Sequence, residues 1–301
     1  MTRVAQTTGA VRAARGRRGL LGAAILAAAA PLAAALVLAA GLQRTAGAGS
    51  GVALRYGFKA GAELTYAHAG HDVMTVHVAG ADPVRMEMDE EMTVVYAVKA
   101  VGPGGIGVLT SRIPRWEAGL TGKGERTPVM PGIDAVSFDL TVAPDGKVGK
   151  VVSHGVPADK EDFRAYVEAL IGTWSALPDK PVTPGATWKD AKDIPTPFVG
   201  LGVLKLHYEV EYALARVETI DGRPHAVVEG HYKVSGAGDS PAGLTMSASG
   251  DGTETSKFDV PRGRYVGQDS SFKLRVTLTG AGGAADVDIE TTGSARLDHA
   301  R

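Results

Sequence analysis

The stretch Met86-Glu-Met-Asp-Glu-Glu-Met-Thr-Val-Val-Tyr-Ala-Val98 decides the fold class of this chain. Apolar side chains occupy every second position along it, and Glu90 is the residue that interrupts this series. Charged and polar residues fill most of the positions in between. Successive side chains of a β-strand point to opposite faces, so this period of two predicts a long strand with one face buried.

The same alternation returns later and extends the prediction to most of the chain. Residues 204–214 place leucine, tyrosine and valine on one face and lysine, histidine and glutamate on the other, and residues 272–278 show a similar division. Turn signals such as Gly102-Pro-Gly-Gly105 and Pro144-Asp-Gly146 separate these stretches. We therefore expect a mainly β protein in which roughly eight to ten long strands form one curved antiparallel sheet, like half of a barrel.

One segment departs from the period of two. Between Asp159 and Leu177 the apolar residues follow the i, i+3, i+4, i+7 spacing of an amphipathic helix. Asp159 is a suitable N-cap, and Pro178 stops the segment. The sequence predicts one helix over residues 159–177, packed on the apolar face of the sheet.

The sequences on the two sides of this helix are alike. Tyr96-Ala-Val-Lys-Ala-Val101 matches Tyr212-Ala-Leu-Ala-Arg-Val217, and Gly61-Ala62 matches Gly185-Ala186, at offsets of 116 and 124 residues. Such matches predict an internal duplication, in which each half is a meander of similar strands. We expect residues 49–301 to form a single β-rich domain, with halves at about residues 52–155 and 180–299.

The first 48 residues predict export. Arginines precede an apolar run from Gly19 to Leu42, and no acidic residue occurs before Glu63. This is the pattern of a secretion signal, and Ala46-Gly47-Ala48 is a suitable cleavage site. The 24-residue run is also long enough to cross a bilayer, so an uncleaved N-terminal membrane anchor is the alternative. Arg17-Arg18 leaves the twin-arginine route open beside the general secretory route.

The composition of the remaining chain narrows the classes of partner. The chain has 32 basic and 33 acidic residues, and residues 1–48 hold six of the arginines and none of the acids, so residues 49–301 have a net charge of −7. This charge disfavours nucleic acids and anionic membrane surfaces, and membrane contact is expected only through the N-terminal segment. The absence of cysteine excludes disulfides and thiolate metal sites. We expect a periplasmic or otherwise extracytoplasmic protein, either soluble or tethered.

Three motifs carry a resemblance to a known family. They are Phe58-Lys-Ala-Gly61, the Met/Glu-rich stretch that leads into Tyr96-Ala-Val-Lys-Ala-Val101, and Leu177-Pro-Asp-Lys-Pro-Val with Trp188 behind it. Together they resemble the DUF6263-like family of uncharacterised exported bacterial proteins, over most of residues 49–301. The family implies no activity. Its architecture is similar to the lipoprotein-carrier half-barrels, in which a curved sheet and a helix enclose a cavity for lipid.

We therefore expect a non-catalytic protein that holds a lipid or other hydrophobic ligand in the concave face of its sheet. The alternative is a structural or protein-interaction module with a packed core and no ligand. Met86, Met88 and Met92 lie on one face of their predicted strand. Methionine side chains fill cores and also adapt to varied apolar ligands, so these residues suit both hypotheses. The residues expected to line the cavity have apolar or aromatic side chains on the predicted inner face: Met86, Met88, Met92, Phe163, Val167, Leu170, Tyr208 and Tyr212.

The sequence predicts no enzyme, cofactor or metal site. It contains no G-x-S-x-G elbow and no lysine-containing phosphate loop. The histidines and the carboxylate near the first strand alternate between its faces, so they cannot all point at one ion, and we expect them to be surface polar residues. These residues are His68, His71, Asp72 and His77.

Overall fold

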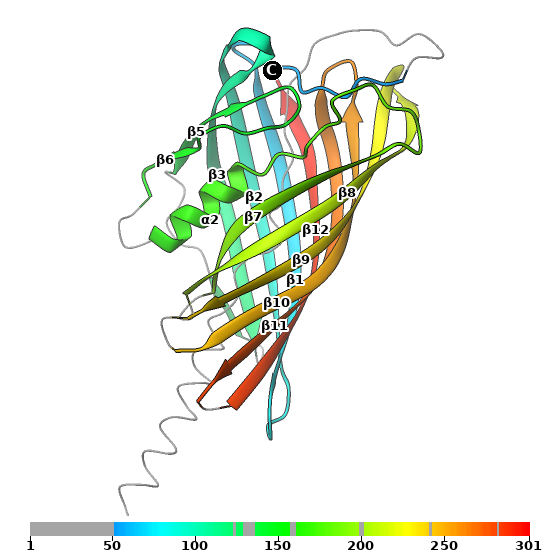
Figure 1. Ribbon diagram of the computed structural model, residues 1–301. Helices are drawn as coiled ribbons and strands as arrows, with labels where there is room; N and C mark the ends of the chain where they lie inside the picture. Colours follow the sequence, from blue (N-terminus) through cyan, green and yellow to red (C-terminus); the bar gives the residue numbers. More distant parts are fainter. Residues whose placement is uncertain are drawn as a thin grey trace, which may run out of the picture.

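The computed structural model describes residues 51–122, 125–128, 136–156, 161–198, 202–240, 243–281 and 283–301. Residues 1–48, on which the export prediction rests, lie outside these ranges. The described elements are shown in Figure 1. They are β1 (Glu63–Val78), β2 (Val84–Val101), the 3-10 helix η1 (Pro103–Gly105), β3 (Gly107–Gly122), β4 (Glu125–Pro128), β5 (Ser137–Val142), β6 (Val152–His154), α2 (Glu161–Ile171), β7 (Thr187–Phe198), β8 (Gly202–Ile220), β9 (Arg223–Asp239), β10 (Thr245–Asp259), β11 (Arg264–Gly280) and β12 (Gly283–Ala300).

The strands form one curved antiparallel sheet (Figure 1). Its order is β6-β5-β3-β2-β1-β12-β11-β10-β9-β8-β7, and β4 pairs with β3. The first and last described strands are therefore neighbours inside the sheet, where β1 pairs with β12 along almost its whole length. Nine of the described strands have 12 to 19 residues, which confirms the predicted sheet of roughly eight to ten long strands.

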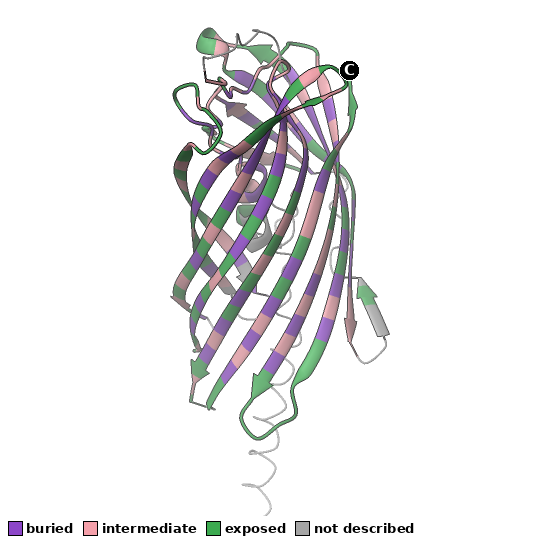
Figure 2. Cartoon of the chain, turned by 90° about the vertical axis from the view of Figure 1, so that its right-hand side faces the viewer, coloured by how far each residue is buried: buried purple, intermediate pink, exposed green. Residues whose placement is uncertain are grey.

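The alternation in the sequence separates the two faces of this sheet. Along β2, Met86 and Met88 are buried while Asp89 and Glu91 are exposed. Figure 2 shows buried and exposed residues alternating along the long strands. The outer face carries cross-strand ion pairs, such as the one between Arg275 Nε and Asp288 Oδ1 at 2.6 Å, so its polar groups are satisfied in contact with water.

Helix α2 lies on the concave side of the sheet, between β6 and β7, and contacts both (Figure 1). Val167, Leu170 and Ile171 are buried, whereas Arg164 and Ala165 are exposed. This confirms the predicted packing of one amphipathic helix on the sheet. Among the described residues, no helix is both long enough and apolar enough to cross a membrane.

The predicted C-terminal end of the helix is wrong: α2 ends at Ile171, not at Leu177. Gly172 has a low helix propensity, and the hydroxyl of Thr173 donates a 2.6 Å hydrogen bond to the carbonyl of Ala169, in the last turn. Residues 172–177, here called the strap, continue without helical structure.

The strap is held by groups from distant parts of the chain. The hydroxyl of Tyr56 donates to the carbonyl of Ser175 at 3.1 Å, and Trp188 Nε1 donates to the carbonyl of Ala176 at 2.8 Å. The amide of Leu177 donates to the carbonyl of Asp145 at 2.9 Å, whereas in a helix extended to Leu177 it would donate to the carbonyl of Thr173. Tertiary partners have therefore replaced the helix that local spacing predicted.

The sheet stays open at β7 because of its sequence. This edge strand pairs with β8 and contains Pro195 and Pro197, which have no N–H to offer a further strand. Helix α2 packs beside this edge instead. The opening is thus covered by side-chain packing and not by a ladder of backbone hydrogen bonds.

The two halves share backbone details that support the predicted duplication. Gly61 N donates to the carbonyl of Val98 at 2.9 Å, and Gly185 N donates to the carbonyl of Leu214 at 2.8 Å. The register of β2 with β3 shifts directly after Val98, and that of β8 with β9 shifts directly after Leu214. The duplication stays a prediction, because similar hydrogen bonds and register shifts can also arise in strands without common ancestry.

Candidate ligand-binding cavity

The concave face contains two apolar clusters. The helix-side cluster packs around α2 and the strap and includes Tyr66, Met92 and Trp174. The far cluster lies toward the other end of the strands and includes Met86, Met88 and residues such as Leu204 and Leu206. Five strands contribute to this face with apolar residues at both ends and a buried polar residue in between.

These five polar residues are here called the polar row. On β1, Asp72 lies between Tyr66 of the helix-side cluster and Met74 of the far cluster. On β2, β10, β11 and β12 a buried polar residue likewise lies between residues of the two clusters. Each is at most 4% exposed: Asp72, Glu90, Glu254, Gln268 and Thr291.

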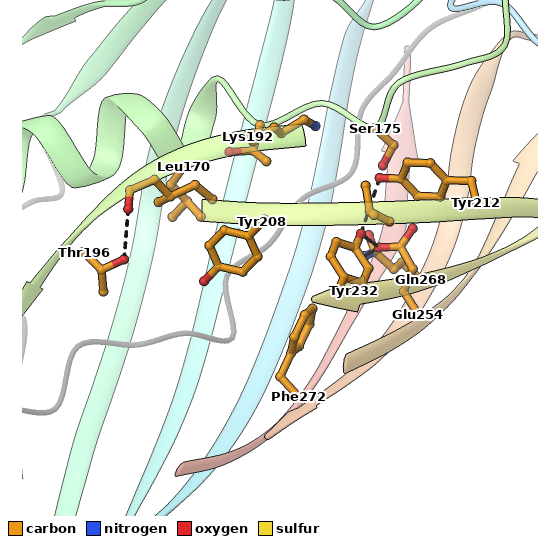
Figure 3. Close-up of a pocket in the computed structure, with 13 residues that line it drawn as sticks. Leu170, Ser175, Lys192, Thr196, Tyr208, Tyr212, Tyr232, Glu254, Gln268 and Phe272 are labelled. Atoms are coloured by element: carbon orange, nitrogen blue, oxygen red, sulfur yellow. Dashed lines mark hydrogen bonds between the residues drawn. The ribbon is translucent and has the colours of Figure 1, made fainter. Parts of the chain in front are cut away.

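A cavity of about 60 Å³ opens beside the polar row, beneath α2 and the strap (Figure 3). It lies against β7, β8, β9, β10 and β11. A cavity needs at least about 10–15 Å³ to hold one water molecule, so this space is large enough for water. One end is walled mainly by apolar and aromatic side chains, namely Leu170, Ile194, Tyr208, Val210 and Phe272, and Thr173 and Thr196 also border the cavity. The other end is polar, with Ser175, Lys192, Tyr212, Tyr232, Glu254 and Gln268.

Glu254 is the centre of the polar end. Its Oε2 accepts hydrogen bonds from the hydroxyl of Tyr232 and, at 2.8 Å, from Gln268 Nε2. Tyr232 in turn lies 3.4 Å from the hydroxyl of Tyr212 (Figure 3). Gly230 faces Glu254 on one side and Tyr212 on the other, and a β-carbon there would lie 2.8 Å from Glu254 Cγ. The glycine therefore gives this carboxylate room to enter the cavity wall.

Two oxygen atoms of the polar end have no hydrogen-bond partner among the described residues. They are Oε1 of Glu254 and Oε1 of Gln268. Burial raises the pKa of Glu254, while the Tyr232 hydrogen bond and the charge of Lys192 lower it in part. A buried acceptor without a partner costs roughly 1–3 kcal/mol, so both atoms favour a ligand or water that donates to them.

Lys192 supplies a positive charge at the same end, but its charge is already engaged. Its Nζ lies 3.2 Å from Asp190 Oδ2 and donates a hydrogen bond to the carbonyl of Trp174 in the strap. Burial lowers the pKa of Lys192, and the neighbouring Asp190 opposes this effect. The pair of Lys192 and Asp190 is close to neutral, so Glu254 has no full counter-charge of its own.

The structure brings together three of the eight residues predicted to line a cavity. Leu170, Tyr208 and Tyr212 border the cavity. Val167 is buried in the helix-side cluster, and the side chain of Phe163 lies outside the described part of the chain.

The three predicted methionines do not border this cavity. Met92 belongs to the helix-side cluster, and Met86 and Met88 belong to the far cluster. All three lie on β2, which β1 and β12 separate from the strands that form the cavity wall. The alternation along β2 correctly predicted that these methionines face inward. It cannot show which strands lie beneath the helix, because that depends on the order of the strands in the sheet.

Sequence reasoning missed Lys192, Glu254 and Gln268. A signal was present, because Glu254 shares its strand face with Met246, Ala248 and Phe258. A polar residue on the inward face of a long strand marks a buried polar group, in the same way that Glu90 interrupts the apolar series of β2.

The histidines near the first strand divide between the two faces, as their spacing predicted. His71 and His77 face outward, where they pair with Asp89 at 2.8 Å and Asp288 at 3.2 Å. The expectation that all four residues lie at the surface is wrong for Asp72, which is 2% exposed, and for His68, whose Nε2 is buried.

Inward-facing polar groups of this region have shifted pKa values. Burial raises the pKa of Glu90 to about 8 and that of Asp72 to about 6, and it lowers the pKa of His68 to about 4. No group of three or more metal-binding side chains occurs among the described residues. Asp72 accepts a hydrogen bond from Thr291, and burial disfavours the ionised form of both carboxyl groups.

Comparisons with known proteins give little further guidance. No family model matches the chain, and no curated protein matches it. A solved structure described as "Lipid-protein interactions in lipovitellin" is similar over 81% of this chain, with 14% identity and a TM-score of 0.44. The match covers 26% of the lipovitellin chain, so this protein spans about a quarter of that length. Similarity at this level carries no argument about function.

Proposed function

We propose that this protein binds a single-chain amphiphile, a molecule with an apolar chain and a polar head, in the cavity beneath α2. The observation that carries the proposal is the division of the cavity wall. Its apolar end has Leu170, Val210 and Phe272, and its polar end has buried oxygen atoms without partners. A predominantly apolar pocket with a few placed polar groups is the usual form of a small-molecule site.

The size of the cavity sets how such a ligand enters. About 60 Å³ accommodates a polar head and the first carbons of a chain, but not a whole lipid tail. A longer chain requires α2 to lift off the sheet, away from both β6 and β7. That movement breaks side-chain packing and the hydrogen bonds of Ser153 N and Oγ to Glu168 Oε1, at 3.1 and 2.5 Å, but no strand pairing.

The proposed setting is outside the cytoplasm, as the basic and apolar segment of residues 1–48 indicates. A carrier or a holding protein needs no catalytic group, and none is part of this proposal. The competing function is a structural module in which the cavity holds only water.

The experiment is calorimetric titration of the purified full chain with 1-octanol, a neutral amphiphile that is soluble without detergent. We expect saturable binding at one site. Val210→Phe directs a ring into the cavity and should abolish it, while Val234→Phe, a buried position of the far cluster on β9, should keep it. Thermal unfolding of both variants checks that they are folded. Absence of binding to the wild type, or equal loss in both variants, contradicts the proposal.

A further inference from the structure

Resting on the proposed function, we infer that the ligand carries a primary ammonium head, which binds the carboxylate of Glu254. The first reason is the kind of polar atom that the cavity leaves unfilled. Glu254 Oε1 and Gln268 Oε1 are both acceptors without partners among the described residues. These two side chains lie side by side, because Gln268 Nε2 donates to Glu254 Oε2 at 2.8 Å (Figure 3).

Each of three polar-end side chains already donates one hydrogen bond. Tyr232 and Gln268 Nε2 both donate to Glu254, and Lys192 Nζ donates to the strap carbonyl of Trp174. Among the described residues, the two buried side-chain atoms of the cavity wall without a partner are both acceptors, so a ligand head that donates hydrogen bonds satisfies both. An ammonium group has three donors and no acceptor, so it fits this arrangement.

The second reason is charge. Lys192 and Asp190 form an ion pair, 3.2 Å apart, and compensate each other. Glu254 is 4% exposed, and its hydrogen bonds to described residues come from the neutral groups of Tyr232 and Gln268. A buried carboxylate without a partner is unfavourable, and a ligand cation would supply the missing charge. A hydroxyl head would fill one acceptor but would leave the charge uncompensated.

Binding of a cation should then depend on pH. Burial raises the pKa of Glu254, so the carboxyl group keeps its proton to higher pH in the empty cavity. The other groups that face it are Lys192 with its partner Asp190, and tyrosines whose raised pKa values keep them neutral: Tyr56, Tyr212, Tyr232 and Tyr265. An alkylammonium ion favours the ionised form of Glu254, so its affinity should rise with pH until this carboxyl group is fully ionised.

The test compares octylamine, 1-octanol and sodium octanoate, which share one chain, in titrations of the full chain at pH 6, 7 and 8. We expect octylammonium to bind at least about tenfold more tightly than octanol at pH 8, as a charge-assisted hydrogen bond predicts, and octanoate to bind most weakly. The octylammonium affinity should rise from pH 6 to pH 8 and the octanol affinity should stay constant. This pH profile of the wild type needs no variant.

Two variants test whether Glu254 causes the preference for octylammonium over octanol. Glu254→Gln should remove the preference for octylammonium over octanol and the pH dependence of octylammonium binding. Glu90→Gln is the matched control, because it changes another buried glutamate of the polar row that does not border the cavity, and it should leave both ligands unchanged.

The outcomes separate the two proposals. If none of the three probes binds, the proposed function fails. If octanol binds as tightly as octylammonium, or if the preference survives in Glu254→Gln, the proposed function stands and the ammonium head is wrong. In that case water molecules fill the two acceptors.

Discussion

The hydroxyl of Thr291 donates a 2.5 Å hydrogen bond to Asp72 Oδ1 inside the concave face. This bond joins β12 to β1, the last and first described strands, which face each other directly at these two residues. Both side chains are 2% exposed. The polar row is thus part of the connection between the two halves of the sheet as well as the boundary between its apolar clusters.

Thr291→Val should destabilise the protein by about 1–3 kcal/mol, because it leaves a buried carboxyl oxygen without its donor. The matched control is Thr277→Val, which removes a similar 2.7 Å bond to Asp286 at a partly exposed position and should cost less than about 1 kcal/mol. Urea unfolding of the two variants measures the difference. Equal costs would show that water already satisfies Asp72.

Glu90 should make the protein less stable at alkaline pH. Its pKa is about 8 in the folded protein, against an ordinary value of 4.5, because of burial first and the neighbouring Asp72 second. Between these two pH values the folded state keeps a proton that the unfolded state has lost. The contribution of Glu90 to stability is therefore greatest below about pH 4.5 and is lost as pH rises through 8.

Urea unfolding between pH 7.5 and pH 9 tests this prediction, since this window lies above the folded and ordinary pKa values of His68, about 4 and 6.5, and above the pKa of Asp72, about 6. The free energy of unfolding should fall with pH in the wild type and stay nearly constant in Glu90→Gln. Glu91→Gln, at the exposed neighbour, should follow the wild type. A wild type without this fall would mean that Glu90 is ionised and solvated.

Gly146→Ala should destabilise the contact between the strap and the turn after β5. Gly146 has a φ of 87°, and a β-carbon there would overlap the carbonyl oxygen of Ser175. Gly80 has a similar φ of 75°, but its surroundings are open. Gly80→Ala should therefore cost only the backbone strain of about 1–2 kcal/mol, and Gly146→Ala about 1–3 kcal/mol more. Thermal unfolding compares them, and similar melting temperatures would contradict the close approach.

Glu168→Ala should loosen α2 without unfolding the sheet. The substitution removes the acceptor of two hydrogen bonds from Ser153, worth about 1 kcal/mol at this half-buried position, or about fivefold in an opening equilibrium. Hydrogen exchange should accelerate in a peptide covering residues 161–171, while a peptide from β12 stays unchanged. Faster association of 1-octanol should accompany the change. Equal exchange in both proteins would show that apolar packing alone holds the helix.

Much of the fold could be predicted because its signals are local. The period of two along Met86–Val98 gave the strands and their inner face, and the helical spacing gave α2. The end of the helix could not be predicted, because Tyr56 and Trp188, which hold the strap, lie 119 and 12 residues away from the carbonyls they bind.

The sequence by itself determined the kind of elements, their number to within a few strands, and which side chains face inward. Only the tertiary structure decided the order of the strands. It placed β10 and β11 beneath the strap and left β2, with its methionines, outside the cavity wall. The physical reason is that side-chain alternation is a property of one strand, whereas the cavity depends on pairings between residues far apart in the chain. The buried Glu254 is visible in the sequence only as a polar residue on an apolar face, and its partners appear once the sheet is assembled.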